Sequence, residues 1–275
     1  MIFDTHCHYN LEPLFTDWET AWQLAQEHGV TQSTIIGVDI QTSHRAVAMA
    51  KIDDRLHPVI GIHPSELQTL VENNPRTNID ELQKKMLSQL QALTTLANQS
   101  AIKGIGETGL DYYRLPDDEE VVKVIKQLQA ESFIWQLELA HQEQVPLIIH
   151  VRDRQDQAYW DTLDILQKHY QGQQPFILHC VSGPIEYVQT AVELGAFIGL
   201  AGNTTYKNAD HLRSLIKLTA PDRLLLETDA PFLPPQEHRG QVCQPWMIQL
   251  TATYLQEDLG LNLDTIYQNS VQLFT

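Results

Sequence analysis

The sequence predicts an α/β protein of the (β/α)8 TIM-barrel class, formed by a single domain that spans residues 1–275. Short β-rich runs alternate along the whole chain with segments of helical periodicity, which is typical of a parallel sheet covered by helices. Eight such runs occur, the number that closes a barrel. The length of 275 residues also suits a one-domain α/β barrel of about 250 residues.

Each expected strand is a short apolar run rich in β-branched residues. In chain order the runs are Ile2 to His6, Ser33 to Val38, His57 to Ile62, Ile102 to Glu107, Pro146 to His150, Phe176 to His179, Ala196 to Leu200 and Arg223 to Glu227.

Helices are expected between and after these strands, because apolar residues recur there at helical spacing. The expected helices are Trp18 to His28, Thr42 to Ala50, Ile79 to Ala97, Val121 to Gln142, Gln157 to Tyr170, Ile185 to Leu194, Asp210 to Leu218, Trp246 to Leu259 and Leu263 to Phe274. Two polar, proline-bearing segments, Asn73 to Asn78 and Leu115 to Glu119, are expected to be loops that belong to insertions after strands. Barrel enzymes place substrate-facing parts in such loops.

The charge balance argues against a broad nucleic-acid-binding surface. The chain carries 18 Lys and Arg residues against 35 Asp and Glu residues, a formal charge of −17. A protein that holds a polynucleotide by its surface charge needs the opposite sign. Any polynucleotide would therefore be held locally, and bound cations could supply that contact.

The cysteines and the N-terminal residues indicate a cytoplasmic protein. Cys7, Cys180 and Cys243 form an odd set without CxxC spacing, which favours neither a disulfide framework nor a structural zinc site. The first residues lack the basic start and long apolar segment of a signal peptide. No apolar run reaches the length of about 18 residues that a membrane span needs, and no obligate protein partner is evident.

Two histidines follow the first expected strand in DTHCHYN, residues 4–10. Strand side chains alternate, so His6 and His8 point to one side and Cys7 to the other. Two neutral imidazoles at this spacing can chelate one divalent ion, although two surface histidines would give the same pattern. The position favours a site, because barrel enzymes work at the carboxyl ends of the strands.

Other potential ligands also lie at expected strand ends. Glu107, in GIGETGLDYY, offers a carboxylate that can bridge two cations, or can cap a turn. His150 in LIIHVRD and His179 in ILHCVSG could complete a second metal site. Asp229 in LLLETDAPFL follows an apolar strand, where a carboxylate needs a cation or hydrogen bonds to offset desolvation. A solvated turn aspartate is the alternative.

Supporting groups accompany these residues. Arg152 suits a phosphate oxygen because its planar guanidinium donates in pairs, or it forms a salt bridge with Asp153 or Asp156. Asp111 could hold a neighbouring ligand or cap a turn. His57 begins its strand and should therefore lie at the opposite, structural face of the barrel.

Five motifs in fixed order resemble those of the TatD family of metal-dependent deoxyribonucleases, a branch of the amidohydrolase-like barrels. They are HxH, GETGLDY, HVRD, HCxSG and ETDAP, and the resemblance covers essentially the whole chain. GIHPS at 61–65, which contains His63, and GNTTYKNA at 202–209 resemble two further family motifs. After the eighth strand the family often has Arg-Gly-Lys-x-Asn-Glu-Pro, whereas here Arg239-Gly240 leads to Cys243-Gln244-Pro245.

The resemblance implies a two-metal hydrolase of DNA, with exonuclease and sometimes endonuclease activity. Two divalent cations, Mg, Mn or Zn, would activate water for attack on phosphorus. Asp229 would take the water proton, while His63 would contact the phosphate or assist the leaving oxygen. The same scaffold hydrolyses lactones and amides, so a small-molecule hydrolase is one alternative. A metal-stabilised protein that only binds a partner is another.

Overall fold

Eight parallel strands follow one another around a single sheet in the order of the chain. The computed structural model describes residues 1–74 and 77–275. The strands are β1 (Ile2–Cys7), β2 (Val30–Ile36), β3 (Leu56–Ile60), β4 (Gly104–Asp111), β5 (Leu147–Arg152), β6 (Phe176–Leu178), β7 (Phe197–Leu200) and β8 (Leu224–Leu226).

The sheet nearly closes on itself where β8 meets β1. Cys7 forms a parallel bridge with Ala230. Beside it, the His8 backbone N–H donates to the Ala230 carbonyl at 2.8 Å, and the Asp229 N–H donates to the His6 carbonyl at 2.9 Å. These bonds join the carboxyl ends of the first and last strands, and the predicted TIM barrel is confirmed.

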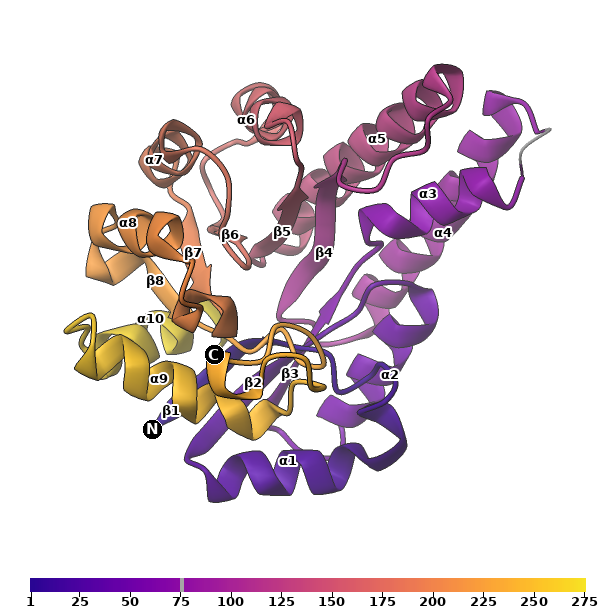
Figure 1. Cartoon of the computed structure of the whole chain (residues 1–275). Helices are drawn as coiled ribbons and strands as arrows, with labels where there is room; N and C mark the ends of the chain where they lie inside the picture. Colours follow the sequence, from indigo (N-terminus) through magenta and orange to yellow (C-terminus); the bar gives the residue numbers. More distant parts are fainter. Residues whose placement is uncertain (75–76) are drawn as a thin grey trace.

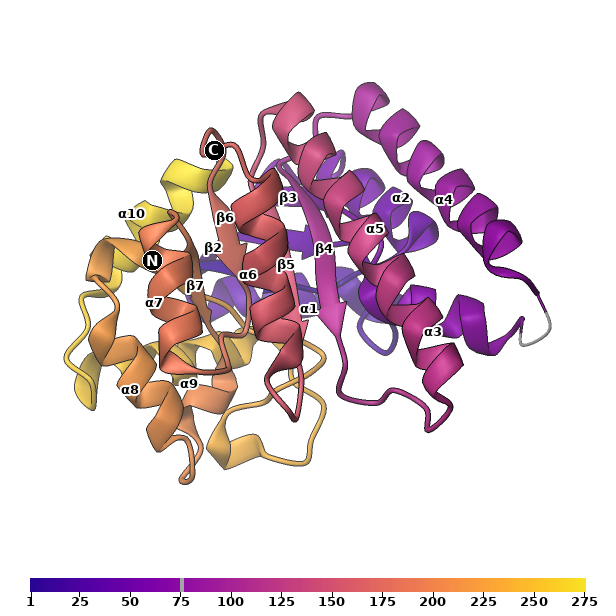
Figure 2. The same cartoon turned by 90° about the horizontal axis from the view of Figure 1, so that it is seen from above.

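Helices surround the strands (Figure 1). Figure 2 shows α4 alongside α5 on the outside of the barrel, and α10 packs against β8 and β1. None of the described helices combines the length and apolar composition that crossing a membrane requires. The helices are α1 (Trp18–Glu27), α2 (Ile40–Ala50), α3 (Pro64–Glu72), α4 (Ile79–Gln99), α5 (Glu119–Glu143), α6 (Gln157–His169), α7 (Ile185–Glu193), α8 (Asp210–Leu218), α9 (Ile248–Glu257) and α10 (Leu263–Phe274).

Helix α3 and strand β4 depart most from the sequence prediction. Helix α3 was not predicted; it begins directly after His63, with Pro64 at its first position, where proline's fixed φ suits a helix start. Of the loop expected at 73–78, Pro75 and Arg76 lie outside the described residues.

Strand β4 was predicted to end at Glu107 but continues to Asp111, because Thr108 to Asp111 pair with Ile149 to Arg152 of β5. The register shifts between Ile105 and Thr108. Glu107 therefore lies inside the strand, at this irregularity, and β4 and β5 together carry Asp111 and Arg152 toward the mouth of the barrel.

Candidate metal centre

Three side chains converge where β1 meets β8. His6 is fully buried in β1 and His8 follows that strand. Their Nε2 atoms lie 3.2 Å apart, and Asp229 Oδ1 lies 3.7 Å from the first and 3.4 Å from the second. Asp229 has a left-handed backbone, with φ of 59°, a conformation that aspartate and asparagine adopt more readily than most residues.

Glu107 connects this group with a second one. Its Oε1 lies 2.8 Å from both His150 Nδ1 and His179 Nε2. Its Oε2 lies 3.5 Å from His6 Nε2 and 3.7 Å from His8 Nε2. The two oxygens of one buried carboxylate therefore face two separate pairs of imidazoles.

The outer nitrogens of two imidazoles have acceptors that fix the tautomer. His8 Nδ1 donates to the Ile36 carbonyl at 3.0 Å, and His150 Nε2 donates to Asp111 Oδ2 at 3.3 Å. Each neutral ring then keeps its lone pair on the nitrogen that faces the centre. This arrangement is the usual support of metal-binding histidines.

The donor set fits divalent cations. Three groups of side chains each bring their ligand atoms within 4.8 Å of one another: His6, Glu107 and His179; His6, His8 and Asp229; and His63, Glu107 and His150. Imidazole lone pairs that face one another at this range repel unless a cation or proton lies between them. Burial opposes ionisation of Glu107, but His179, His63 and His150 outweigh it and hold the pKa of this carboxyl well below its usual value.

His63 takes part differently. It is the N-cap of α3, where its Nδ1 accepts from the Ser65 backbone N–H at 3.1 Å. The ring proton of the neutral imidazole therefore lies on Nε2, which is 3.5 Å from Glu107 Oε1. At this position His63 presents a hydrogen-bond donor to the centre, whereas His8 and His150 present lone pairs.

Two further buried carboxylates, Asp4 and Glu227, bond to residues that adjoin the candidate ligands. Asp4 is fully buried and accepts from the Thr228 hydroxyl at 2.7 Å and the Thr228 N–H at 3.0 Å. Burial raises the pKa of Asp4 to about 8 despite these bonds. Glu227 accepts from the Cys180 N–H, and only glycine fits opposite it, because a Cβ at Gly199 would lie 2.3 Å from its Oε2. Thr228 and Cys180 adjoin Asp229 and His179, so both carboxylates position neighbours of the centre.

The whole chain matches a known family. The sequence profile described as TatD related DNase covers residues 3–275. The chain belongs to this family.

Several relatives are similar over nearly their full lengths. An uncharacterized metal-dependent hydrolase of Bacillus subtilis, YabD, is 30% identical over 278 residues, which cover 100% of this chain and 99% of that protein. YcfH of Escherichia coli K12, described in the same words, is 29% identical over 276 residues, with 99% and 94% covered. The crystal structure of YJJV, a TatD homologue from Escherichia coli K12, superposes with a TM-score of 0.82 at 26% identity, covering 99% of this chain and 97% of that one. The chain is thus a TatD-family metal-dependent hydrolase.

The barrel brings together the predicted metal ligands of this TatD-family chain. His6, His8, Glu107, His150, His179 and Asp229 meet at one centre, and His63 lies beside Glu107. His57 lies away from them, as expected from its strand position, and donates to Gln32 Oε1 at 2.7 Å. The sequence reasoning missed Asp4, although a carboxylate in an apolar strand two residues before His6 was a usable signal.

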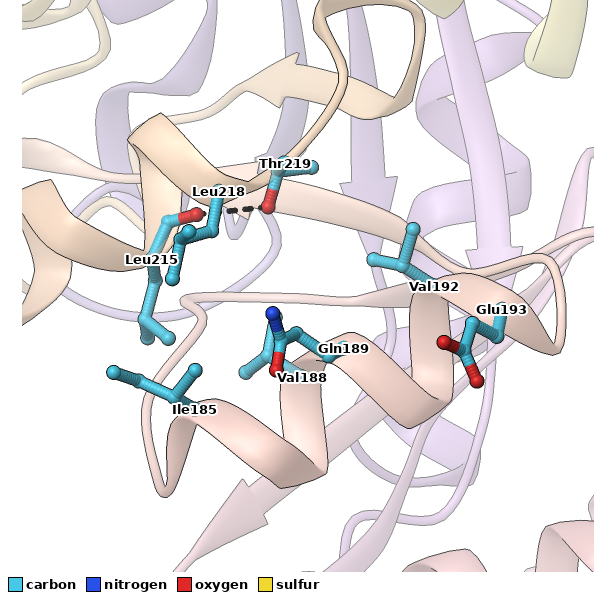
Figure 3. A pocket seen from close by; sticks show the side chains of 8 residues that line it. All are labelled: Ile185, Val188, Gln189, Val192, Glu193, Leu215, Leu218 and Thr219. Atoms are coloured by element: carbon cyan, nitrogen blue, oxygen red, sulfur yellow. Dashed lines mark hydrogen bonds between the residues drawn. The ribbon is translucent and has the colours of Figure 1, made fainter.

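Two other parts of the TatD-family chain lie outside the centre. Cys243, in the segment that departs from the family motif, is buried, and its N–H donates to the Pro231 carbonyl at 3.0 Å. A groove of about 190 Å³ lies between α7 and α8 (Figure 3). It belongs to the outer helical layer and has mainly aliphatic walls, so it is separate from the metal centre. Its lining residues are Ile185, Val188, Gln189, Val192, Glu193, Leu215, Leu218 and Thr219.

Proposed function

We propose that the protein is a deoxyribonuclease, an exonuclease that hydrolyses phosphodiester bonds in DNA with two divalent cations. The observation that carries this proposal is the position of Glu107, whose two oxygens face two different histidine pairs. A carboxylate shared in this way is typical of two-metal hydrolases of phosphate esters. The description of the matched family as a DNase supports DNA as the substrate.

Two cations held by these donors would share Glu107. His6, His8 and Asp229 would hold one cation, while His150 and His179 would hold the other. When bound, such a pair lowers the pKa of water toward about 7 and offsets charge on a phosphoryl oxygen. The positive charge of the cations would also offset, at the site, the repulsion between DNA and a protein with a formal charge of −17.

The protein's own residues handle the proton and the substrate. Asp229 is the proton acceptor for the attacking water, since its carboxylate lies at the centre and is ionised at neutral pH: burial would raise its pKa, but the hydrogen bond with His8 and the charges of His179 and His6 lower it. His63 donates from Nε2 to a phosphate oxygen or to the leaving oxygen, in keeping with its tautomer. Arg152 binds a phosphate oxygen at the rim.

The test is a gel assay of the purified protein on end-labelled single-stranded and double-stranded DNA. Parallel reactions contain Mg, Mn, Zn or a chelator. Lactone and amide substrates are tested with the same metal-loaded preparation, because barrels of this kind support those reactions as well. We expect nucleotide release from DNA that depends on the cation. Hydrolysis of lactones or amides with intact DNA would refute the proposal.

A further inference from the structure

An exposed pair of arginines encloses one tyrosine beside the metal centre. The guanidinium carbon of Arg152 lies 3.9 Å from the centroid of the Tyr113 ring, and that of Arg154 lies 4.2 Å from it. A guanidinium stacked on an aromatic face keeps the N–H groups at its edge free to donate. A side-chain hydrogen bond from Arg154, followed by the positive charges of Arg154 and Arg152, also lowers the pKa of the Tyr113 hydroxyl.

Within residues 1–74 and 77–275, neither guanidinium forms an ion pair with a carboxylate. Asp153, a partner considered from the sequence, accepts from the backbone N–H groups of Arg154, Gln155 and Ala158. Two arginines elsewhere in this acidic chain are paired by contrast, Arg55 with Asp53 at 2.6 Å and Arg213 with Asp210 at 2.6 Å. The two arginines at Tyr113 therefore remain available to an anionic ligand.

The position of this group relative to the centre follows from the hydrogen bonds. His150 faces Glu107 with one nitrogen and Asp111 with the other. Asp111 in turn accepts from the Tyr113 N–H at 2.9 Å through its other oxygen. The imidazole of His150 and the carboxylate of Asp111 therefore separate Tyr113 and the two arginines from Glu107. A phosphate bound there is not the one that reacts at the centre.

We propose that Tyr113, Arg152 and Arg154 form a subsite for a second, non-reacting phosphate of the polynucleotide, next to the phosphodiester that is cleaved. The proposal rests on the proposed function. It assigns Tyr113 and Arg154 to substrate binding and implies that the protein selects substrates with more than one phosphate. Arg154 supplies donors to the phosphate, and Tyr113 holds both guanidinium planes in place.

The experiment compares a DNA oligonucleotide with bis(p-nitrophenyl) phosphate, a diester that has one phosphate. The metal-loaded wild type is measured beside Arg154→Gln, Arg154→Lys and Tyr113→Leu. Arg223→Gln is the matched control, because Arg223 also lies over an aromatic ring, 5.0 Å from the Phe197 centroid, but precedes β8 at the opposite end of the barrel. Oligonucleotide affinity is measured separately by fluorescence anisotropy.

For Arg154→Gln we expect a KM for the oligonucleotide about tenfold higher with little change in kcat, since one charged phosphate contact is lost. The ratio of kcat/KM for the oligonucleotide to that for the single diester falls by the same factor, and Arg154→Lys recovers part of it. An Arg154→Gln protein that binds the oligonucleotide as tightly as Arg223→Gln does would overturn the subsite. Failure of the wild type to cleave either diester would instead refute the proposed function, while the anisotropy comparison would still decide on the subsite.

Discussion

Glu107 and Asp229 are both buried carboxylates of the centre, but they face different partners. Glu107 lies within 3.7 Å of His6, His8, His150 and His179, whereas Asp229 faces only the first two of these histidines at comparable distances. Glu107→Gln should therefore weaken both cation positions, because an amide lacks the charge and the second strong oxygen. Bound metal and turnover on DNA should fall together.

Asp229→Asn should behave differently, since asparagine tolerates the same left-handed backbone but cannot accept the water proton. We expect turnover to fall more than metal content. Elemental analysis beside a DNA cleavage assay measures both quantities for each variant. A Glu107→Gln protein that keeps both metals and near-normal turnover would show that the shared ligand lies elsewhere.

His57 lies near the amino end of β3, away from the metal centre, and its burial leads to a prediction about stability. Burial, together with the charge of Lys103, lowers the pKa of His57 from 6.5 to about 4. As pH falls below 6.5 the unfolded chain binds this proton first, so the free energy of unfolding declines between about pH 6.5 and pH 4, by about 3 kcal/mol. His57→Gln should remove this part of the pH dependence. Denaturant unfolding near pH 7 and pH 4 tests it, and equal pH dependence in both proteins would refute it.

The candidate ligands could be predicted from the sequence, because parallel strands bring their carboxyl ends to one edge and the six residues occur at or near such ends. The role of Tyr113 could not be predicted in this way. Its contact with Arg152 and Arg154 depends on β4 continuing to Asp111 beside β5, which neither sequence segment indicates by itself.

At the scale of elements, a buried glutamine of helix α5 links the segment that follows β3 to the middle of β4. The Gln136 amide accepts from Ile62 N–H at 2.9 Å and donates to the Ile62 carbonyl at 3.0 Å and to Thr108 Oγ1 at 2.8 Å. Ile62 and Thr108 directly adjoin His63 and Glu107. One side chain thereby sets the spacing of two site residues from different strands.

Replacement of this glutamine by leucine should destabilise the protein by about 2–4 kcal/mol, because buried backbone groups at Ile62 lose their partners. Affinity for the cation should fall several-fold as Glu107 loses its alignment. Gln83→Leu on α4 is the control, since the Gln83 side chain bonds, among the described residues, only to the Glu131 carboxylate, and the change should alter stability by about 0.5 kcal/mol or less. Denaturant unfolding and metal titration measure both effects, and equal losses in the two variants would contradict this role.

Helix α3 shows where sequence periodicity fails. It has nine residues, of which Pro64, Leu67 and Val71 are buried, so its apolar pattern is too short to stand out from a loop. The start signal was present, however. Pro64 follows His63, and the imidazole serves as an N-cap, a role for which serine, threonine, aspartate and asparagine are the residues usually considered.

For the whole molecule, the formal charge of −17 predicts an unusual salt response for a nuclease. If Arg152 and Arg154 make the main phosphate contacts outside the cations, the logarithm of DNA affinity should fall with the logarithm of salt with a slope of about −2 or shallower. Fluorescence anisotropy over a range of salt concentrations gives this slope. A slope expected for about six or more phosphate contacts would reveal a basic groove at variance with this account.

Removal of the cations should affect the activity of the whole molecule but not its folding. The barrel closes through backbone bonds between β1 and the segment after β8, and none of the six candidate ligands belongs to the hydrophobic core clusters. A chelator should therefore abolish activity without unfolding the chain, in contrast to a structural metal site. Circular dichroism with and without chelator tests this expectation, and cooperative unfolding on chelation would contradict it.

The most direct test of the two-cation centre is a titration of metal-free protein with Mg, Mn or Zn, in which bound metal per chain and DNA cleavage are measured in the same samples. The account predicts no cleavage in excess chelator and full cleavage only when two cations are bound per chain. Full activity of the chelated, dialysed protein, or a plateau at one cation, would contradict it.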